Sequence, residues 1–175
     1  MKTLLILRHA KSSWDNTELS DFERPLNSRG IETAPVMGNL IYKKRLKPNL
    51  IISSPAKRAK QTAVLIKEIA QILPPIKYEE KIYEASPMGL LNIVGEIDNK
   101  NETVLLIGHN PGLEGFIKIL TGENKSMPTA GLAVIELDIN SWDEIKNDCG
   151  KLNALIRPRD EIRILEISEK YSKNF

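Results

Sequence analysis

The only two histidines of the chain each follow a short apolar segment that is typical of a buried strand. His9 comes after residues 3–7, and His109 comes after residues 103–107. In an open α/β sheet, binding and catalytic groups gather beyond the carboxyl ends of the strands. Two such strands can direct both imidazoles at one ligand. Arg8 lies directly before His9 and indicates that this ligand is an anion.

Together with Arg58, these residues have the chemistry that phosphoryl transfer requires. A phosphoryl group in transfer spreads negative charge over three oxygens, so it needs fixed donors and an in-line nucleophile. An arginine fork bonds two of these oxygens at once, and an unprotonated histidine nitrogen can attack phosphorus. We therefore expect one histidine to attack while the other donates. Considered singly, each residue also fits a structural role: a surface or core histidine, or a solvated helix arginine.

Short apolar segments alternate with amphipathic helical patterns along the first 120 residues. Three segments lack polar alternation and are predicted to be strands buried on both faces: residues 3–7, Leu50–Ser53 and residues 103–107. Apolar stripes at helical spacing occupy residues 34–41, 56–73, 88–97 and 113–120. This alternation predicts an α/β fold, with a mostly parallel sheet and helices on both faces.

The chain after Gly131 has a different pattern. Leu132–Leu137 and residues 151–156 are predicted to be two strands joined by a turn region, a hairpin at the sheet edge with at least one antiparallel strand. Residues 76–83 are a further strand candidate. Residues 10–29 are polar and poorly periodic, and a loop of that length in a compact domain is usually functional.

Three residues that precede prolines predict helix starts. Ser54, Ser86 and Asn110 are good N-caps, each followed by a proline at the first helical position. A helix N-terminus attracts anions through its unpaired N–H groups and its dipole. Arg58 follows one of these starts and His109 directly precedes another. We therefore expect two helix starts to point toward the site that His9 faces.

The composition limits the class of protein. The chain has 175 residues and a formal charge of +2, which fit a single domain over residues 1–175 and give no reason to expect nucleic-acid binding. Cys149 is the only cysteine, so neither an internal disulfide nor a cysteine metal cluster can form. No apolar stretch reaches the roughly 18 residues of a membrane span, and the N-terminal run is too short for a signal peptide. We expect a cytoplasmic monomer with no membrane association.

Five blocks of the sequence resemble, in the same order, the motifs of the histidine phosphatase superfamily, also called the phosphoglycerate mutase-like group. They are LRHAKSSW at residues 7–14, DFERPLNSRG at 21–30, SSPAKRAKQT at 53–62, VLLIGHNPG at 104–112 and RPRD at 157–160. The second and the last resemble the small SixA-like phosphohistidine phosphatase branch in particular. The chain departs at Ala10, where glycine is common in the superfamily, but alanine is small enough for the site to be retained.

The resemblance implies roles for the four basic residues. His9 would be the nucleophile that forms a transient phosphohistidine, while Arg8, Arg58 and His109 would bind the phosphoryl oxygens. It also implies the phosphoglycerate mutase-like fold and no metal or organic cofactor. Two histidines are in any case too few for a histidine-rich metal site.

Four further residues are weaker candidates. Glu84 has the place of the carboxylic acid that protonates the leaving alcohol in many superfamily members, or is a surface carboxylate. The small branch can manage without this acid, because a phosphoramidate leaving group departs more easily. Arg24 adds charge to the pocket rim or braces its loop, and Ser12 donates to a phosphate oxygen or to local backbone. Asn110, beside His109, is a candidate for substrate binding.

These observations predict a phosphatase that acts through a covalent phosphohistidine, most readily on phosphohistidine in a phosphorylated protein partner. The chain is short and has little room for a lid after Arg58, so the pocket would be open to a protein-borne phosphoryl group. Small phosphoesters would enter it as well. The alternatives are a small-molecule phosphomonoesterase, a phosphoglycerate mutase-type enzyme, and a non-catalytic phosphate-binding regulatory module. His9 separates the last of these from the enzymes, because binding does not need an unprotonated nucleophile.

Overall fold

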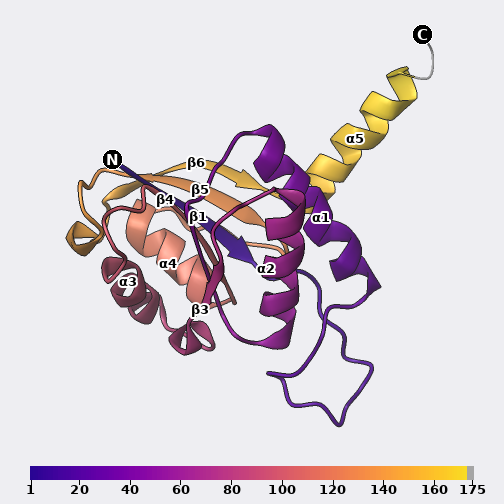
Figure 1. The fold of residues 1–175 in the computed structure, drawn as a ribbon, viewed down its shortest axis with the longest axis horizontal. Helices are drawn as coiled ribbons and strands as arrows, with labels where there is room; N and C mark the ends of the chain where they lie inside the picture. Colours follow the sequence, from indigo (N-terminus) through magenta and orange to yellow (C-terminus); the bar gives the residue numbers. More distant parts are fainter. Residues whose placement is uncertain (173–175) are drawn as a thin grey trace.

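A six-stranded mixed sheet forms the middle layer of the molecule (Figure 1). The structure is a computed structural model that describes the backbone of residues 1–172 and the side chains of residues 1–166. In chain order the strands are β1 (Lys2–Arg8), β2 (Leu50–Ser53), β3 (Ile76–Tyr78), β4 (Thr103–Gly108), β5 (Leu132–Leu137) and β6 (Gly150–Ile156). Their spatial order is β3-β2-β4-β1-β5-β6. The first four in that order are parallel, and β5 and β6 are each antiparallel to the preceding neighbour.

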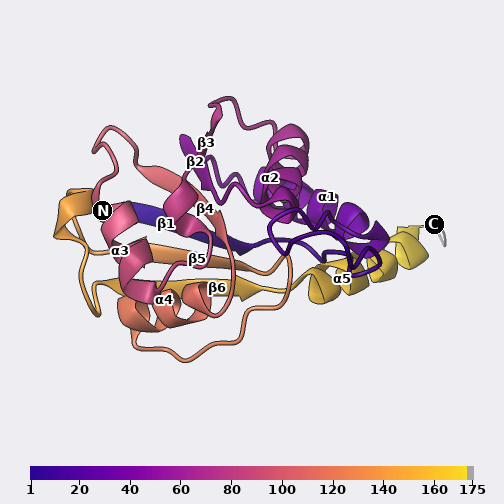
Figure 2. The same cartoon turned by 90° about the horizontal axis from the view of Figure 1, so that it is seen from below.

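Helices cover both faces of this sheet, as the alternation of segments predicts. They are α1 (Ser28–Lys43), α2 (Lys57–Ile69), α3 (Pro87–Gly95), α4 (Gly112–Thr121) and α5 (Pro158–Ser172), with short 3-10 helices at Glu80–Ile82 and Trp142–Glu144. Figures 1 and 2 show α1 and α2 on one face and α3 and α4 on the other. The mostly parallel sheet, the two helical layers and the antiparallel edge near the C-terminus are therefore confirmed.

The two faces of β1 lie in two separate apolar cores. Leu5 and Leu7 pack with Met37 and other residues of α1 and α2, whereas Leu4 and Ile6 pack with Phe116 and other residues of α3 and α4. All four strand residues are completely buried, which explains why the strand has no polar alternation. Burial of such a side chain contributes about 1.5–3 kcal/mol, so β1 and its register are strongly specified.

The register of the three central parallel strands brings the candidate residues together. Arg8 at the end of β1 is paired with Gly108 at the end of β4, so His9 and His109 follow at equivalent places on neighbouring strands. Ser53 at the end of β2 is paired with Ile107, which places Ser54 on the other side of His109. Three strand ends therefore meet at one edge of the sheet.

The loop between β1 and α1, residues 9–27, returns across this edge. The N–H of Leu26 donates to the Gln61 side chain of α2 at 2.8 Å, and the N–H of Lys57 donates to the carbonyl of Phe22 at 3.0 Å. At Gly30 an added Cβ would lie 2.1 Å from the Lys11 carbonyl oxygen, so glycine permits the close approach of α1 to this loop. The loop is thereby held against the ends of both helices.

Two of the three predicted N-caps are wrong. Ser86 caps α3 and accepts from the N–H of Gly89, but α2 begins after Ala56 and α4 begins after Pro111. The Ser54 hydroxyl lies next to His109, and the Asn110 amide donates to Glu114 and to the Met127 carbonyl. Tertiary contacts at the sheet edge therefore use the side chains that local preference would have assigned to capping.

Two predicted element boundaries also differ. The strand candidate at residues 76–83 is a strand only over Ile76–Tyr78, because the chain then turns into the 3-10 helix Glu80–Ile82. The apolar stripe at residues 56–73 extends past the end of α2 at Ile69, and Leu73 is 91 % exposed. Beyond the central sheet, α5 starts beside α1 and extends away from the body of the molecule (Figure 2). Within the part of the chain that is described, every helix is too short or too polar to cross a bilayer.

Candidate active site

His9 follows β1 and is held in one tautomer. It is 7 % exposed, and its Nδ1 lies 2.7 Å from the carbonyl oxygen of Ala10. A carbonyl can only accept, so Nδ1 carries the proton and Nε2 has a free lone pair. Nε2 in turn accepts from Nε of Arg58 at 3.3 Å. Burial lowers the pKa of His9 to about 3, the bond to Ala10 opposes this, and the charges of His109, Arg58 and Arg8 add to the lowering. The imidazole is neutral at pH 7, with Nε2 suited to nucleophilic attack.

His109 follows β4 and faces His9. The two ring centroids are 5.0 Å apart, and the planes are tilted by 51°. Nε2 of His109 lies 2.7 Å from Oγ of Ser54, whereas Nδ1 is buried and has no partner among the described residues. Burial, followed by the charge of Arg58, lowers the pKa of His109 to about 4. Because a hydroxyl both donates and accepts, Ser54 allows either tautomer of this ring.

Two guanidinium groups complete the cluster. Nη1 of Arg8 donates to the carbonyl of Met127 at 2.9 Å, and burial lowers the pKa of Arg8. Arg58 is 6 % exposed and donates through Nη1 to the carbonyl of Asp21 at 2.6 Å and through Nη2 to its carboxylate at 3.0 Å. The structure therefore brings Arg8, His9, Arg58 and His109 to one edge of the sheet.

Three buried side-chain polar atoms have no hydrogen-bond partner within the described residues, and all three belong to this cluster or its immediate neighbour. They are Nε of Arg8, Nδ1 of His109 and Oδ1 of Asn110. Buried polar atoms are almost always paired, so an orphaned group requires an explanation. An arginine N–H is a donor only, and an imidazole nitrogen can donate in one of its tautomers. Nε of Arg8 and Nδ1 of His109 are therefore suited to donate hydrogen bonds to oxygens of a bound anion.

Asp21 is the functional candidate that sequence reasoning missed. Its carboxylate accepts from Arg24 at 2.8 Å, from Arg58 at 3.0 Å and from the Tyr83 hydroxyl at 2.8 Å. Burial raises the pKa of Asp21, but the hydrogen bonds from Tyr83, Arg24 and Arg58 prevail and lower it to about 2. Asp21 is an anion that orients Arg58, and its low pKa makes it a poor proton donor. Its presence in the DFERPLNSRG block was a signal, but nothing in the sequence placed it against Arg58.

Glu84 lines a cavity on the α3 side of the cluster, together with Arg58, His109, Asp21 and Tyr83. The residue is exposed, and its backbone has a φ of 55°. This left-handed conformation costs a non-glycine residue on the order of 1 kcal/mol, and such strained residues concentrate at functional sites. The structure thus places a carboxylate in the same cavity as the two groups that would bind the phosphoryl oxygens.

The remaining candidates differ in their access to the cluster. Arg24 donates to Ser12, Ser13 and Asp21 and lies over the ring of Trp14, so all of these contacts are within its own loop. The Ser12 hydroxyl accepts from Arg24 at 2.6 Å and is buried. Neither residue lines the cavity of Glu84, and Arg24 reaches the cluster only through Asp21. Asn110 does line that cavity.

Comparison with known proteins gives a consistent assignment. A family model described as histidine phosphatase superfamily (branch 1) matches residues 4–90. An uncharacterised chloroplastic protein of Arabidopsis thaliana is 29 % identical over 176 residues, which cover 92 % of this chain and 80 % of that protein. The crystal structure of a candidate phosphohistidine phosphatase SixA from Agrobacterium tumefaciens is 28 % identical, with a TM-score of 0.77, and the match covers 90 % of this chain and 98 % of that chain.

A second solved structure shares the fold at lower identity. It is the protein histidine phosphatase SixA in complex with tungstate, and it is 22 % identical with a TM-score of 0.77. The match covers 90 % of this chain and 98 % of that chain. This similarity agrees with the fold described above.

Proposed function

Because this chain belongs to the histidine phosphatase superfamily and resembles its SixA-like branch, we propose that this histidine-dependent phosphatase removes phosphoryl groups from phosphohistidine in a protein. The observation that carries the proposal is the tautomer of His9. The Ala10 carbonyl holds the proton on Nδ1, so the Nε2 lone pair faces the two basic groups Arg58 and His109. A site that only binds phosphate does not require a deprotonated, fixed imidazole.

The proposed reaction has two displacements at phosphorus. In the first, the Nε2 lone pair of His9 forms a P–N bond while the bond to the substrate nitrogen breaks, and that nitrogen leaves as a neutral imidazole after taking a proton. In the second, water attacks phosphorus, the P–Nε2 bond breaks, and inorganic phosphate leaves with His9 restored. Arg8, Arg58 and His109 stabilise the equatorial oxygens in both steps. The proton stays on Nδ1 of His9 throughout, hydrogen-bonded to the carbonyl oxygen of Ala10.

Two observations support a protein-borne phosphohistidine as substrate. The similar structure at 28 % identity is described as a candidate phosphohistidine phosphatase. In addition, the carboxylate closest to the Arg58 guanidinium, Asp21, is held as an anion by its three donors and cannot serve as a general acid. A phosphoramidate leaving group can take its proton from water, whereas an alkoxide leaving group needs an acid.

Glu84 supports a second candidate, a phosphomonoesterase that acts on small molecules. This carboxylate lies in the same cavity as His109 and Arg58, where it could protonate an alcohol leaving group. Under this alternative, Glu84→Gln lowers turnover of an alkyl phosphate by about 10²-fold and leaves the formation of the phosphoenzyme from a phosphoramidate unaffected.

One comparison separates the two candidates. The purified protein is given a phosphohistidine-bearing carrier protein and a panel of alkyl and sugar phosphates, with the His9→Ala variant as control. We expect kcat/KM for the carrier to exceed that for the esters by at least about tenfold, with no turnover of either by the variant. A preference of several orders of magnitude for one ester would overturn the phosphohistidine assignment. Equal activity of wild type and variant would overturn the role of His9.

A further inference from the structure

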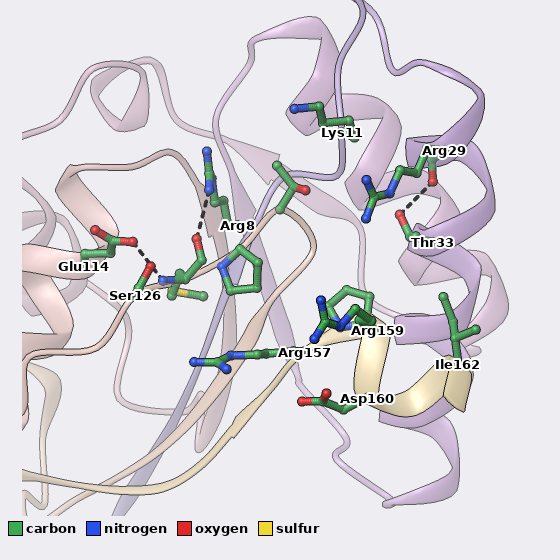
Figure 3. Close-up of a pocket in the computed structure, with 14 residues that line it drawn as sticks. Arg8, Lys11, Arg29, Thr33, Glu114, Ser126, Arg157, Arg159, Asp160 and Ile162 are labelled. Carbon is green, nitrogen blue, oxygen red and sulfur yellow. Dashed lines mark hydrogen bonds between the residues drawn. The ribbon is translucent and has the colours of Figure 1, made fainter. Parts of the chain in front are cut away.

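A second pocket shares Arg8 with the cluster of Arg8, His9, Arg58 and His109, here called the phosphoryl site, and several basic side chains line it (Figure 3). The cavity measures about 500 Å³, within the range of small-ligand sites. Basic residues enter it from three parts of the chain: the end of β1 and the following loop, the first turn of α1, and the junction of β6 with α5. They are Arg8, Lys11, Arg29, Arg157 and Arg159.

The protein neutralises the positive charge of this pocket only in part. Two acidic residues also line it, Glu114 and Asp160. Oε1 of Glu114 already accepts from Nδ2 of Asn110 at 2.7 Å and from the N–H of Met127 at 2.8 Å. None of the five basic residues forms an ion pair with another described residue.

Buried basic residues elsewhere in the molecule are paired. Lys2 bonds Glu102 at 2.9 Å, and Arg24 and Arg58 both bond Asp21. The basic residues of the pocket have no such partner among the described residues, and Lys11, Arg29, Arg157 and Arg159 are exposed to solvent. Like charges gathered in one cavity repel each other, and a bound anion would relieve that repulsion.

Arg8 connects this pocket to the phosphoryl site. It lines the pocket, directly precedes His9 in the chain, and has a buried Nε with no partner among the described residues. Its Nη1 is held by the carbonyl of Met127, which belongs to the 126–129 segment that also lines the pocket. Glu114 lines both this pocket and the cavity of Glu84. The two cavities therefore share Glu114, and Arg8 links this pocket to His9 and its neighbours.

We propose that this pocket is a second anion subsite, which binds an acidic group of the substrate other than the scissile phosphoryl group. This inference rests on the proposed function in one respect: it takes the reacting phosphoryl group to lie beside His9. Arg157 and Arg159 are exposed and would contact the second group directly. The group is a carboxylate near the phosphohistidine of a protein substrate or a second phosphate of a small molecule, and both offer the oxygens that arginine forks bind.

The test measures a ratio of kcat/KM values for matched substrates. One pair consists of phosphohistidine peptides that differ only by Glu or Gln beside the phosphohistidine. The other consists of propane-1,3-diol bisphosphate and propyl phosphate. The enzymes are the wild type, the double variant Arg157→Gln/Arg159→Gln, and Arg163→Gln, which removes an exposed arginine of α5 that does not line the pocket.

For the wild type we expect the acidic member of at least one pair to be preferred by about three- to tenfold, and this preference to shrink as salt is added. The double variant should lower the ratio to about one, and Arg163→Gln should retain it. The pair that shows the effect identifies the source of the anion. A wild-type ratio of one for both pairs, or an unchanged ratio in the double variant, would overturn the subsite.

This test also separates the subsite from the proposed substrate. If the peptides are not hydrolysed but the bisphosphate is preferred and the preference is lost in the double variant, the subsite is supported and the phosphohistidine assignment is overturned. Thermal unfolding of the three proteins checks that the substitutions leave the fold intact, as expected for exposed side chains.

Discussion

The ends of β1 and β4 occupy equivalent places in the sheet, and each carries a histidine, yet their surroundings differ. Nδ1 of His9 bonds a backbone carbonyl, which leaves one tautomer, and its Nε2 accepts from Arg58. Nε2 of His109 bonds the Ser54 hydroxyl, which permits both tautomers, and its Nδ1 is unpartnered among the described residues. The same position in the fold therefore yields an imidazole with one fixed tautomer, which we propose as the nucleophile, and an imidazole with two possible tautomers, which we propose as a donor. The difference comes from the atom that each ring nitrogen bonds, a carbonyl oxygen for His9 and a hydroxyl for His109, and not from the position at the strand end.

Loss of the nucleophile should have the largest effect. His9→Ala is expected to lower kcat/KM by at least about 10³-fold, because the variant lacks the imidazole nitrogen on which the proposed covalent intermediate forms. Rapid acid-free quenching with a radiolabelled substrate should trap an acid-labile, base-stable phosphoenzyme in the wild type and none in this variant. If His9→Ala still forms a phosphoenzyme, the assignment of His9 as the nucleophile is wrong.

Loss of the donor should have a smaller effect of a different kind. His109→Ala removes one group that stabilises the phosphoryl oxygens, so we expect about a 10²-fold decrease in kcat. Unlike the His9 variant, it should still accumulate phosphoenzyme with the same stability in base. A variant that retains full kcat, or one that forms no phosphoenzyme, would contradict the division of roles.

The two histidines should also make the protein less stable in acid. Their pKa values are lowered to about 3 and about 4, so between these values and pH 6.5 the unfolded chain binds protons that the folded protein excludes. The free energy of unfolding then falls as the pH falls, by about 1.4 kcal/mol per pH unit for each histidine. Both contribute from pH 6.5 to about 4, and only His9 contributes from there to about 3.

Denaturant unfolding at a series of pH values checks this prediction. His9→Gln and His109→Gln should each lose stability less steeply than the wild type below pH 6.5, and only the His9 variant should differ in slope below pH 4. Parallel curves for all three proteins would mean that the imidazoles are protonated in the folded state.

The smallest expected effect concerns the hydroxyl beside His109. Ser54→Ala removes the group that orients this ring, and we expect kcat to fall by about three- to tenfold with KM nearly unchanged. Ser53→Ala is the matched control, because this neighbouring serine is also fully buried but its hydroxyl bonds the backbone carbonyl of Ser54. Equal losses in the two variants would show that Ser54 acts through packing alone.

Much of the site could be predicted because its two histidines directly follow apolar segments that are recognisable in the sequence. The apolar segments before His9 and His109 determine two buried strands, and parallel neighbours bring their carboxyl ends to one edge. Asp21 could not be found in this way. It lies in a loop without periodicity, and its contacts to Arg58 and Tyr83 join residues 37 and 62 positions apart. Ser54 and Asn110 were assigned as helix caps for a related reason, because local preference does not register a competing tertiary partner.

Three features could be inferred from the residues alone: the alternation of strands and helices, the strand ends that carry the two histidines, and the family. These depend on the periodicity of apolar residues and on short motifs, both of which act over a few neighbouring positions. The folded arrangement was needed to establish which imidazole nitrogen is free, which carboxylate orients Arg58, and which basic residues surround the second pocket. Tautomers, ion pairs and pockets depend on atoms a few ångströms apart in space, and the chain brings those atoms together from positions more than 100 residues apart.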